Sequence, residues 1–253
     1  MSQYGQALQD TAGLIDSVPQ IAALVDDLYG LSTARPALFI DVEGVDLSRH
    51  GSVSILQILT LPDSRTYLID VHILQGKAFE TPGRNGRTLR DILESKCIPK
   101  VFFDVRNDSD ALYSHFNVNL GCVHDLQLME FASRTFSKRF LTGLSKCIEK
   151  DAPMSFAQRS GWKATKQEGL HLFAPEHGGT YEVFNTRPLP TKIQQYCVQD
   201  VQFLPRLYNY YKARLSEAKL ARVLQLSVER VALSQTVAYN GRGRHMALLP
   251  TGL

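Results

Sequence analysis

Long apolar runs and paired cysteines are both missing from this sequence. No apolar run approaches the roughly 20 residues that a membrane-spanning helix needs, so we expect no membrane segment. The opening residues, MSQYGQALQD, contain neither a basic region nor an apolar core, and we therefore expect no secretory signal. The four cysteines are far apart and form no CxxC pair, which favours reduced thiols in a cytoplasmic or nuclear protein over disulfides.

The composition is that of an ordinary globular protein, but its charge is unevenly spread. Of the 253 residues, 44% are hydrophobic and 21% are charged, and the net charge is only +3. Residues 1–34 contain four aspartates and no lysine or arginine, whereas residues 134–170 contain eight basic and three acidic residues. A basic segment of this kind indicates an anionic partner. A solvated helix face followed by a polar loop explains the same pattern.

Strand and helix patterns alternate along the first half of the chain. Pro19 suits the first turn of a helix within residues 17–30, and Gly30 suits its end. Five strands are expected, at 37–43, 53–60, 66–71, 101–103 and 121–125. Helices are expected at 88–95, at 107–116 and from 126 onward. An antiparallel start that passes into β/α alternation predicts an α/β fold with a mixed sheet flanked by helices.

The second half of the chain has a different pattern. Residues 151–190 contain Pro, Gly and aromatics without clear periodicity, and we interpret them as a long functional loop. A helical pattern resumes at Thr191, a good N-cap, and continues to about Gln235 with a kink at Pro205. We expect a helical extension (1–34), a main domain (35–212) and a C-terminal helix with an irregular tail (213–253) that packs on the domain or extends from it.

Two acids interrupt the apolar segment ALFIDVEGVDLS. In a strand, residues i and i+2 point to the same face, so Asp41 and Glu43 project together at the end of their strand. Carboxylates are rare in a core unless they are paired or bind a cation. Two acids at an exposed strand end are explained equally well by contact with solvent and by a metal site.

Two further groups of acids accompany this pair. KVFFDVRNDSDAL contains Asp104, Asp108 and Asp110 just after a strand, where they could also stabilise the start of a helix. In IQQYCVQDVQFLPRLY, Tyr196 and Asp200 are four residues apart and share one helix face. A surface tyrosine and aspartate would give the same spacing.

If these three groups converge, four carboxylates crowd together and raise one another's pKa values unless cations are present. Mg²⁺ or Mn²⁺ suits a site made only of carboxylates. Two such ions, about 3.5–4 Å apart, stabilise the attacking and leaving oxygens in phosphodiester hydrolysis. Glycoside hydrolysis also uses paired acids, but it needs only two and no helical tyrosine. The basic segment favours a phosphate substrate over a sugar.

The order and spacing of DVE, the Asp108 segment and YCVQD resemble the DEDD superfamily of 3′–5′ exonucleases. The Y-x-x-x-D form is similar to its DEDDy branch, which includes RNase D-like enzymes. The resemblance covers roughly residues 36–212, and it implies a ribonuclease H-like fold with a mixed five-stranded sheet. Each motif is weak singly, whereas three in the right order are fairly specific.

The resemblance carries family roles to five positions of this sequence. Asp41 and Glu43 match the acids of the first motif, and Asp200 matches the last acid, with Tyr196 four residues before it. Asp108 matches the acid of the second motif, with Asp104 as the alternative. The resemblance implies that the four acids (Asp41, Glu43, Asp108 and Asp200) bind two divalent metal ions, Mg²⁺ or Mn²⁺. It also implies that Tyr196 orients the attacking water and that the product is a nucleoside 5′-monophosphate.

The implied partner is the 3′ end of single-stranded nucleic acid, with RNA favoured over DNA. The candidates for contacts with its backbone are four basic side chains: Arg134, Lys138, Arg139 and Lys163. Asp125 resembles a family position just after a strand, and we expect it to cap the next helix.

The sequence also departs from the family pattern. Phe103 and Asp104 stand where RNase D-like sequences often have histidine and a small residue. Residues 161–190 are similar to the branch of Egalitarian-type exonuclease-domain proteins, which includes members thought to bind RNA without cutting it. The alternative function is therefore an inactive or catalytically weak module that binds RNA or acts as an adaptor. The presence of all four acids and the tyrosine favours an active enzyme.

Overall fold

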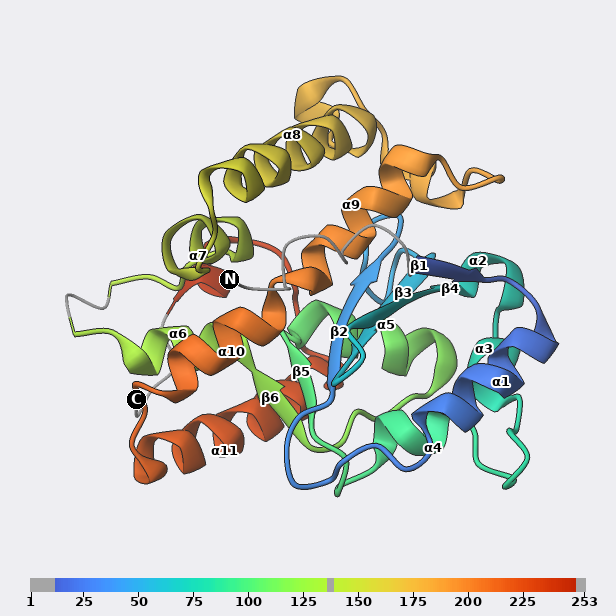
Figure 1. Cartoon of the computed structure of the whole chain (residues 1–253), viewed down its shortest axis with the longest axis horizontal. Coiled ribbons are helices and arrows are strands. Elements are labelled where there is room, and N and C mark those ends of the chain that lie inside the picture. Colours follow the sequence, from blue (N-terminus) through green and yellow to red (C-terminus); the bar gives the residue numbers. More distant parts are fainter. Residues whose placement is uncertain (1–11, 136–138, 249–253) are drawn as a thin grey trace.

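One mixed β-sheet runs through the centre of this computed structural model, which describes residues 12–135 and 139–248 (Figure 1). The sheet order is β1-β4-β3-β2-β5-β6. The strands are β1 (Ala12–Ile15), β2 (Leu38–Glu43), β3 (Ile55–Thr60), β4 (Arg65–Asp70), β5 (Lys100–Phe102) and β6 (Val123–Asp125). The five expected strands are present, and β1 adds a sixth by pairing in parallel with β4. The expected α/β class with a mixed sheet flanked by helices is confirmed.

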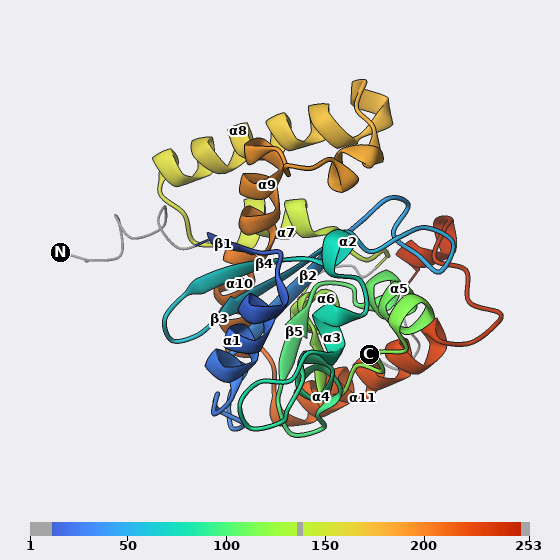
Figure 2. The same cartoon turned by 90° about the vertical axis from the view of Figure 1, so that its right-hand side faces the viewer.

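Helices cover both faces of this sheet (Figure 2). The α-helices are α1 (Val18–Leu28), α2 (Val71–Leu74), α3 (Lys77–Glu80), α4 (Leu89–Glu94), α5 (Arg106–Phe116), α6 (Leu126–Ser133), α7 (Leu144–Asp151), α8 (Phe156–Phe173), α9 (Thr191–Gln202), α10 (Leu204–Lys212) and α11 (Glu217–Ser234). Three 3₁₀ turns are η2 (Pro175–His177), η3 (Tyr181–Asn185) and η4 (Arg244–Ala247). Over the two described ranges, no helix combines the length and the apolar character needed to cross a membrane.

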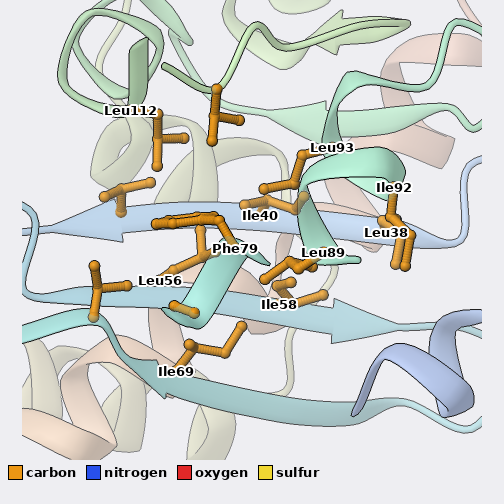
Figure 3. Packing of buried hydrophobic residues seen from close by; sticks show 14 of the residues in the cluster. Leu38, Ile40, Leu56, Ile58, Ile69, Phe79, Leu89, Ile92, Leu93 and Leu112 are labelled. Carbon is orange, nitrogen blue, oxygen red and sulfur yellow. The ribbon is translucent and has the colours of Figure 1, made fainter. Parts of the chain in front are cut away.

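Alternate residues of β2 face two different layers. Leu38 and Ile40 point into the core between the sheet and helices α1, α3, α4 and α5, where Phe79 and Leu89 also pack (Figure 3). Phe39 points to the other face and packs with α6, α10 and α11. Because the side-chain period of a strand is two, Asp41 and Glu43 share the face of Phe39. The hydrophobic pattern thus places the two acids on the face that α9 contacts.

Residues 151–190 are not the long loop that we expected. They contain the 18-residue helix α8, which begins after a capping box formed by Ser155 and Gln158, and the turns η2 and η3. Only Trp162, Gly169 and Phe173 of α8 are buried. A helix that buries one narrow line of residues has little amphipathic periodicity, which is why the sequence did not reveal it.

The helical run after residue 190 is divided into three helices. Thr191 is the first residue of α9 rather than its N-cap, which is Pro190. The chain turns at Phe203, so that Pro205 lies in the first turn of α10, where its missing N–H interrupts no helical hydrogen bond. Helix α11 ends at Ser234, close to the expected end, and it packs on α5, α6 and β6. The division of the chain at residues 34 and 212 stays a prediction.

Candidate active site

Three of the predicted acids meet where β2 ends beneath α9. One carboxylate oxygen from each of Asp41, Glu43 and Asp200 lies within 4.8 Å of the other two. Asp41 and Glu43 are partly buried and Asp200 is buried. β2 ends at Glu43 and is followed by Gly44, where a side chain would collide with the carbonyl oxygen of Ser52. The sheet therefore fixes the first two acids, and α9 brings the third to them.

Tyr196 lies one turn before Asp200 on the same helix and is also buried. Its ring packs against Phe173 of α8, with the ring centroids 4.9 Å apart. Gly169 of α8 stands so close that an added Cβ would collide with Cδ2 of Tyr196. Burial and then the charges of Asp200 and Glu43 raise the pKa of Tyr196 well above its usual value. The hydroxyl therefore stays protonated over the physiological pH range.

Lys166 of α8 reaches into the same cluster, and sequence reasoning did not find it. Its Nζ lies 3.0 and 3.1 Å from the two carboxylate oxygens of Asp200 and 2.9 Å from Oη of Tyr196. The side chain is 17% exposed. In the sequence, Lys166 is one of the eight basic residues of segment 134–170. The line of Trp162, Lys166, Gly169 and Phe173 has helical spacing, and with the capping box of Ser155 and Gln158 it is a signal in the sequence that points to α8.

Asp108 and Asp104 occupy different surroundings. Asp108 is buried in the first turn of α5, and the charge of Asp41 is, after burial, the largest cause of its strongly raised pKa. Asp104 instead forms ion pairs with Arg106 at 2.5 Å and with Arg230 at 3.4 Å. Asp108 thus feels the charge of Asp41 without belonging to the group of three acids, whereas two arginines pair with Asp104.

The crowded acids repel one another. Burial raises the pKa of Asp41 to about 7, with the neighbouring Asp200 as the next cause. Burial and then the charge of Asp41 raise the pKa of Glu43 well above its usual value. A divalent cation removes this repulsion, and hard cations such as Mg²⁺ and Mn²⁺ prefer carboxylate oxygens. The donor set of this cluster therefore fits such an ion.

Two further aspartates of these segments have structural contacts. Asp125 accepts hydrogen bonds from the backbone N–H groups of Gln127, Asp104 and Val105, so the expected helix cap at this position is present. Asp110 pairs with Arg49 at 2.7 Å.

The four predicted nucleic-acid contacts differ in their surroundings. Arg134 is partly buried, with its side chain 6% exposed, and pairs with Glu130 at 2.5 Å. Lys163 is about half exposed and pairs with Glu149 at 2.6 Å. Arg139 is exposed and lines a cavity of about 690 Å³ beside Phe140 and Lys146. Lys138 lies outside the described residues. The role of all four in nucleic-acid binding stays a prediction.

Known proteins resemble this chain in sequence and in fold. The family model for 3′–5′ exonucleases matches residues 19–216. The piRNA biogenesis protein EXD1 of Bombyx mori is 26% identical over 183 residues, which are 72% of this chain and 50% of that protein. The chain thus spans about half the length of the curated relative that it matches.

Solved structures show the same fold. Trypanosoma brucei RNase D, in a complex with RNA U12, has a TM-score of 0.73 and 20% identity, covering 96% of this chain and 77% of that one. Brucella melitensis NrnC with bound Mg²⁺ has a TM-score of 0.57 and 18% identity, covering 92% of this chain and 98% of that one. Escherichia coli RNase D has a TM-score of 0.54 and 19% identity, covering 90% of this chain and 52% of that one. The expected ribonuclease H-like fold is confirmed.

Proposed function

The chain belongs to the 3′–5′ exonuclease family, and from this membership we propose that it removes nucleotides from the 3′ end of single-stranded nucleic acid, with RNA favoured over DNA. The observation that carries the proposal is the cluster of Asp41, Glu43 and Asp200 beside Tyr196. Family membership supplies the reaction class, and the cluster supplies the groups that this reaction needs.

We assign the four acids to two divalent ions. Asp41, Glu43 and Asp200 would hold the first, and Asp41 would hold the second with Asp108, directly or through water. When bound, such ions lower the pKa of a water and neutralise the charge that develops on the leaving oxygen. The raised pKa values of Asp41 and Glu43 support this assignment, because a bound cation would favour the ionised carboxylates that burial and mutual repulsion disfavour.

The side chains then act on the substrate and the water. The protonated Oη of Tyr196 orients the attacking water toward the terminal phosphodiester. The water loses a proton as its oxygen bonds to phosphorus, the bond from phosphorus to the 3′ oxygen breaks, and that oxygen takes up a proton. The terminal residue leaves as a nucleoside 5′-monophosphate. Gly169 and Phe173 fix the position of Tyr196 for this step.

We place the backbone of the strand along the basic segment. Arg139 and Lys146 line the same cavity as the exposed Phe140. Cations that follow a phosphate backbone, together with an aromatic ring on which bases stack, are typical of single-strand binding. The presence of RNA U12 in the Trypanosoma brucei RNase D structure supports RNA as the substrate class.

An oligonucleotide assay tests the proposal. A 5′-labelled single-stranded RNA incubated with Mg²⁺ or Mn²⁺ should shorten stepwise from its 3′ end and release 5′-monophosphates. Asp41→Asn and Asp200→Asn should each lower the rate at least about a hundredfold, because each removes an acid that holds an ion. DNA of the same sequence should shorten more slowly than RNA. Wild-type protein that leaves the RNA intact, or variants that cut as fast as wild type, would show that the chain is not an exonuclease.

One observation favours a second candidate, a module that binds RNA without cutting it. Lys166 already pairs with Asp200, and a lysine can neutralise an acidic site in the absence of divalent ions. Binding of the same RNA in EDTA at the affinity measured in Mg²⁺, without shortening in Mg²⁺, would support the module and exclude the enzyme.

We retain three assignments for the whole chain as proposals. Residues 35–212 form the exonuclease domain, with residues 1–34 and 213–253 as flanking segments. The protein acts in the cytoplasm or the nucleus, which agrees with its four free cysteines, because thiols stay reduced in these compartments.

A further inference from the structure

Lys166 contacts two residues to which the proposed reaction gives a role. All three of its described polar contacts are inside the candidate site: both oxygens of Asp200 and the hydroxyl of Tyr196. The ammonium also lies 4.3 Å from the centroid of the Tyr196 ring. A cation in this place stabilises the acids before any ion has bound.

Helix α8 holds the lysine firmly. Gly169, one turn after Lys166, lets the helix backbone approach Tyr196 closely, and Phe173 packs against the same ring. Trp162, one turn before Lys166, is buried, and its carbonyl accepts a hydrogen bond from Gln199 of α9. The close packing of α8 on α9 therefore directs the lysine side chain at Asp200.

A cation that coordinates Asp200 has to share these oxygens with Lys166. Two cations at such short range repel each other strongly in a partly buried site, where water screens charge poorly. The four-carbon stem of lysine is flexible, so the ammonium can leave Asp200 without movement of the helix.

We propose that Lys166 competes with a divalent ion for Asp200, so that it assembles the metal-free site and sets how tightly the site holds the ion. This inference rests on the proposed function, because it takes Asp200 as an ion ligand. Lys166 is in this sense a positioning residue: it acts through Asp200 and Tyr196. Replacement of Lys166 by an uncharged residue removes the competitor and leaves the three carboxylates in place.

Mn²⁺ binding to the metal-free full chain tests this without any substrate. Titration followed by the electron paramagnetic resonance signal of free Mn²⁺ would compare wild type with Lys166→Met. We expect Lys166→Met to bind Mn²⁺ at least about tenfold more tightly, which corresponds to about 1.4 kcal/mol. The metal-free variant should also melt at a lower temperature than wild type, and Mn²⁺ should raise its melting temperature by more.

Two controls make the result specific. Lys192→Met removes an exposed ion pair with Glu168 that also joins α8 and α9, and it should leave Mn²⁺ affinity unchanged. Lys166→Gln keeps a hydrogen-bond donor but no charge, and it replaces Lys166→Met if that variant does not fold. Circular dichroism of each variant checks the fold.

The outcomes separate this inference from the proposed function. Equal or weaker Mn²⁺ binding by both Lys166 variants would overturn the competition and leave the exonuclease proposal standing. Mn²⁺ binding that follows the expected order without any RNA cleavage would support the competition and reject the enzyme. No Mn²⁺ binding by wild type or by either variant would overturn both.

Discussion

At the scale of single residues, the surroundings of a carboxylate decide its role more than its place in a motif. Asp104 and Asp108 are four residues apart, and the sequence left both open for one role. Two arginines pair with Asp104, while Asp108 is buried near Asp41. Paired acids stabilise a fold, and unpaired buried acids destabilise it unless a cation is bound.

Exchange of each acid for asparagine should separate the two roles. Asp104→Asn should lower the free energy of unfolding by about 1–3 kcal/mol, because it removes charged hydrogen-bond acceptors from Arg106 and Arg230. Asp108→Asn should preserve or raise stability in EDTA and slow RNA cleavage at least about a hundredfold. Urea unfolding and the oligonucleotide assay measure the two effects. The reverse pattern would assign the second-motif role to Asp104.

The raised pKa of Asp41 predicts a pH dependence of stability. A carboxylate whose pKa rises from 3.8 to about 7 on folding favours the folded state while it is protonated. That contribution is complete below about 4 and is lost as the pH rises through about 7. In EDTA, the stability of wild type relative to Asp41→Asn should therefore fall across this window. Mg²⁺ at saturating concentration should abolish the fall, and a difference independent of pH in EDTA would contradict the prediction.

At the scale of elements, α8 is the helix that completes the site. It contributes the cation beside Asp200 and two contacts to Tyr196, although it contributes none of the motif acids. Figure 2 shows that it crosses over α9 on the side away from the sheet. The contribution of α8 to the site therefore depends on how closely the backbone of α8 approaches α9.

Two glycines of α8 provide a matched test of that approach. Gly169→Ala would drive Cβ into the Tyr196 ring, and we expect a loss of about 1–3 kcal/mol in stability together with slower RNA cleavage. Gly161 is exposed and has no atom within 4 Å of an added Cβ. Gly161→Ala should therefore raise stability by up to about 1 kcal/mol, because alanine favours helices. Urea unfolding compares the two, and equal effects would show that α8 does not press on Tyr196.

At the scale of the whole molecule, α11 connects the end of β6 with the start of α5. Arg230 of α11 pairs at 2.7 Å with Asp125, which in turn accepts hydrogen bonds from the backbone at Asp104 and Val105. Ser227 of the same helix accepts a hydrogen bond from the backbone N–H of Asp125. The start of α5, and with it Asp108, is therefore held by a helix more than a hundred residues later in the chain.

Loss of the ion pair between α11 and Asp125 should lower the free energy of unfolding of the whole protein. Arg230→Met leaves the fully buried Asp125 without its ion pair, and we expect a loss of about 3–5 kcal/mol. Arg222→Met removes a surface ion pair with Glu229 on the same helix and should cost less than about 1 kcal/mol. Thermal unfolding of both variants tests this. Similar losses would mean that α11 only covers the sheet.

The sequence by itself determined the α/β class, the five central strands and the pairing of Asp41 with Glu43 on one face, because strand periodicity is local. It also determined that Tyr196 and Asp200 share a helix face. Only the tertiary structure showed that Asp108 is buried and feels the charge of Asp41 while Asp104 pairs with two arginines, and that Lys166 enters the cluster from 34 residues before Asp200. The physical reason is that such contacts join residues far apart in the sequence. They depend on how helices and strands pack, and the periodic pattern of a single helix or strand does not show them.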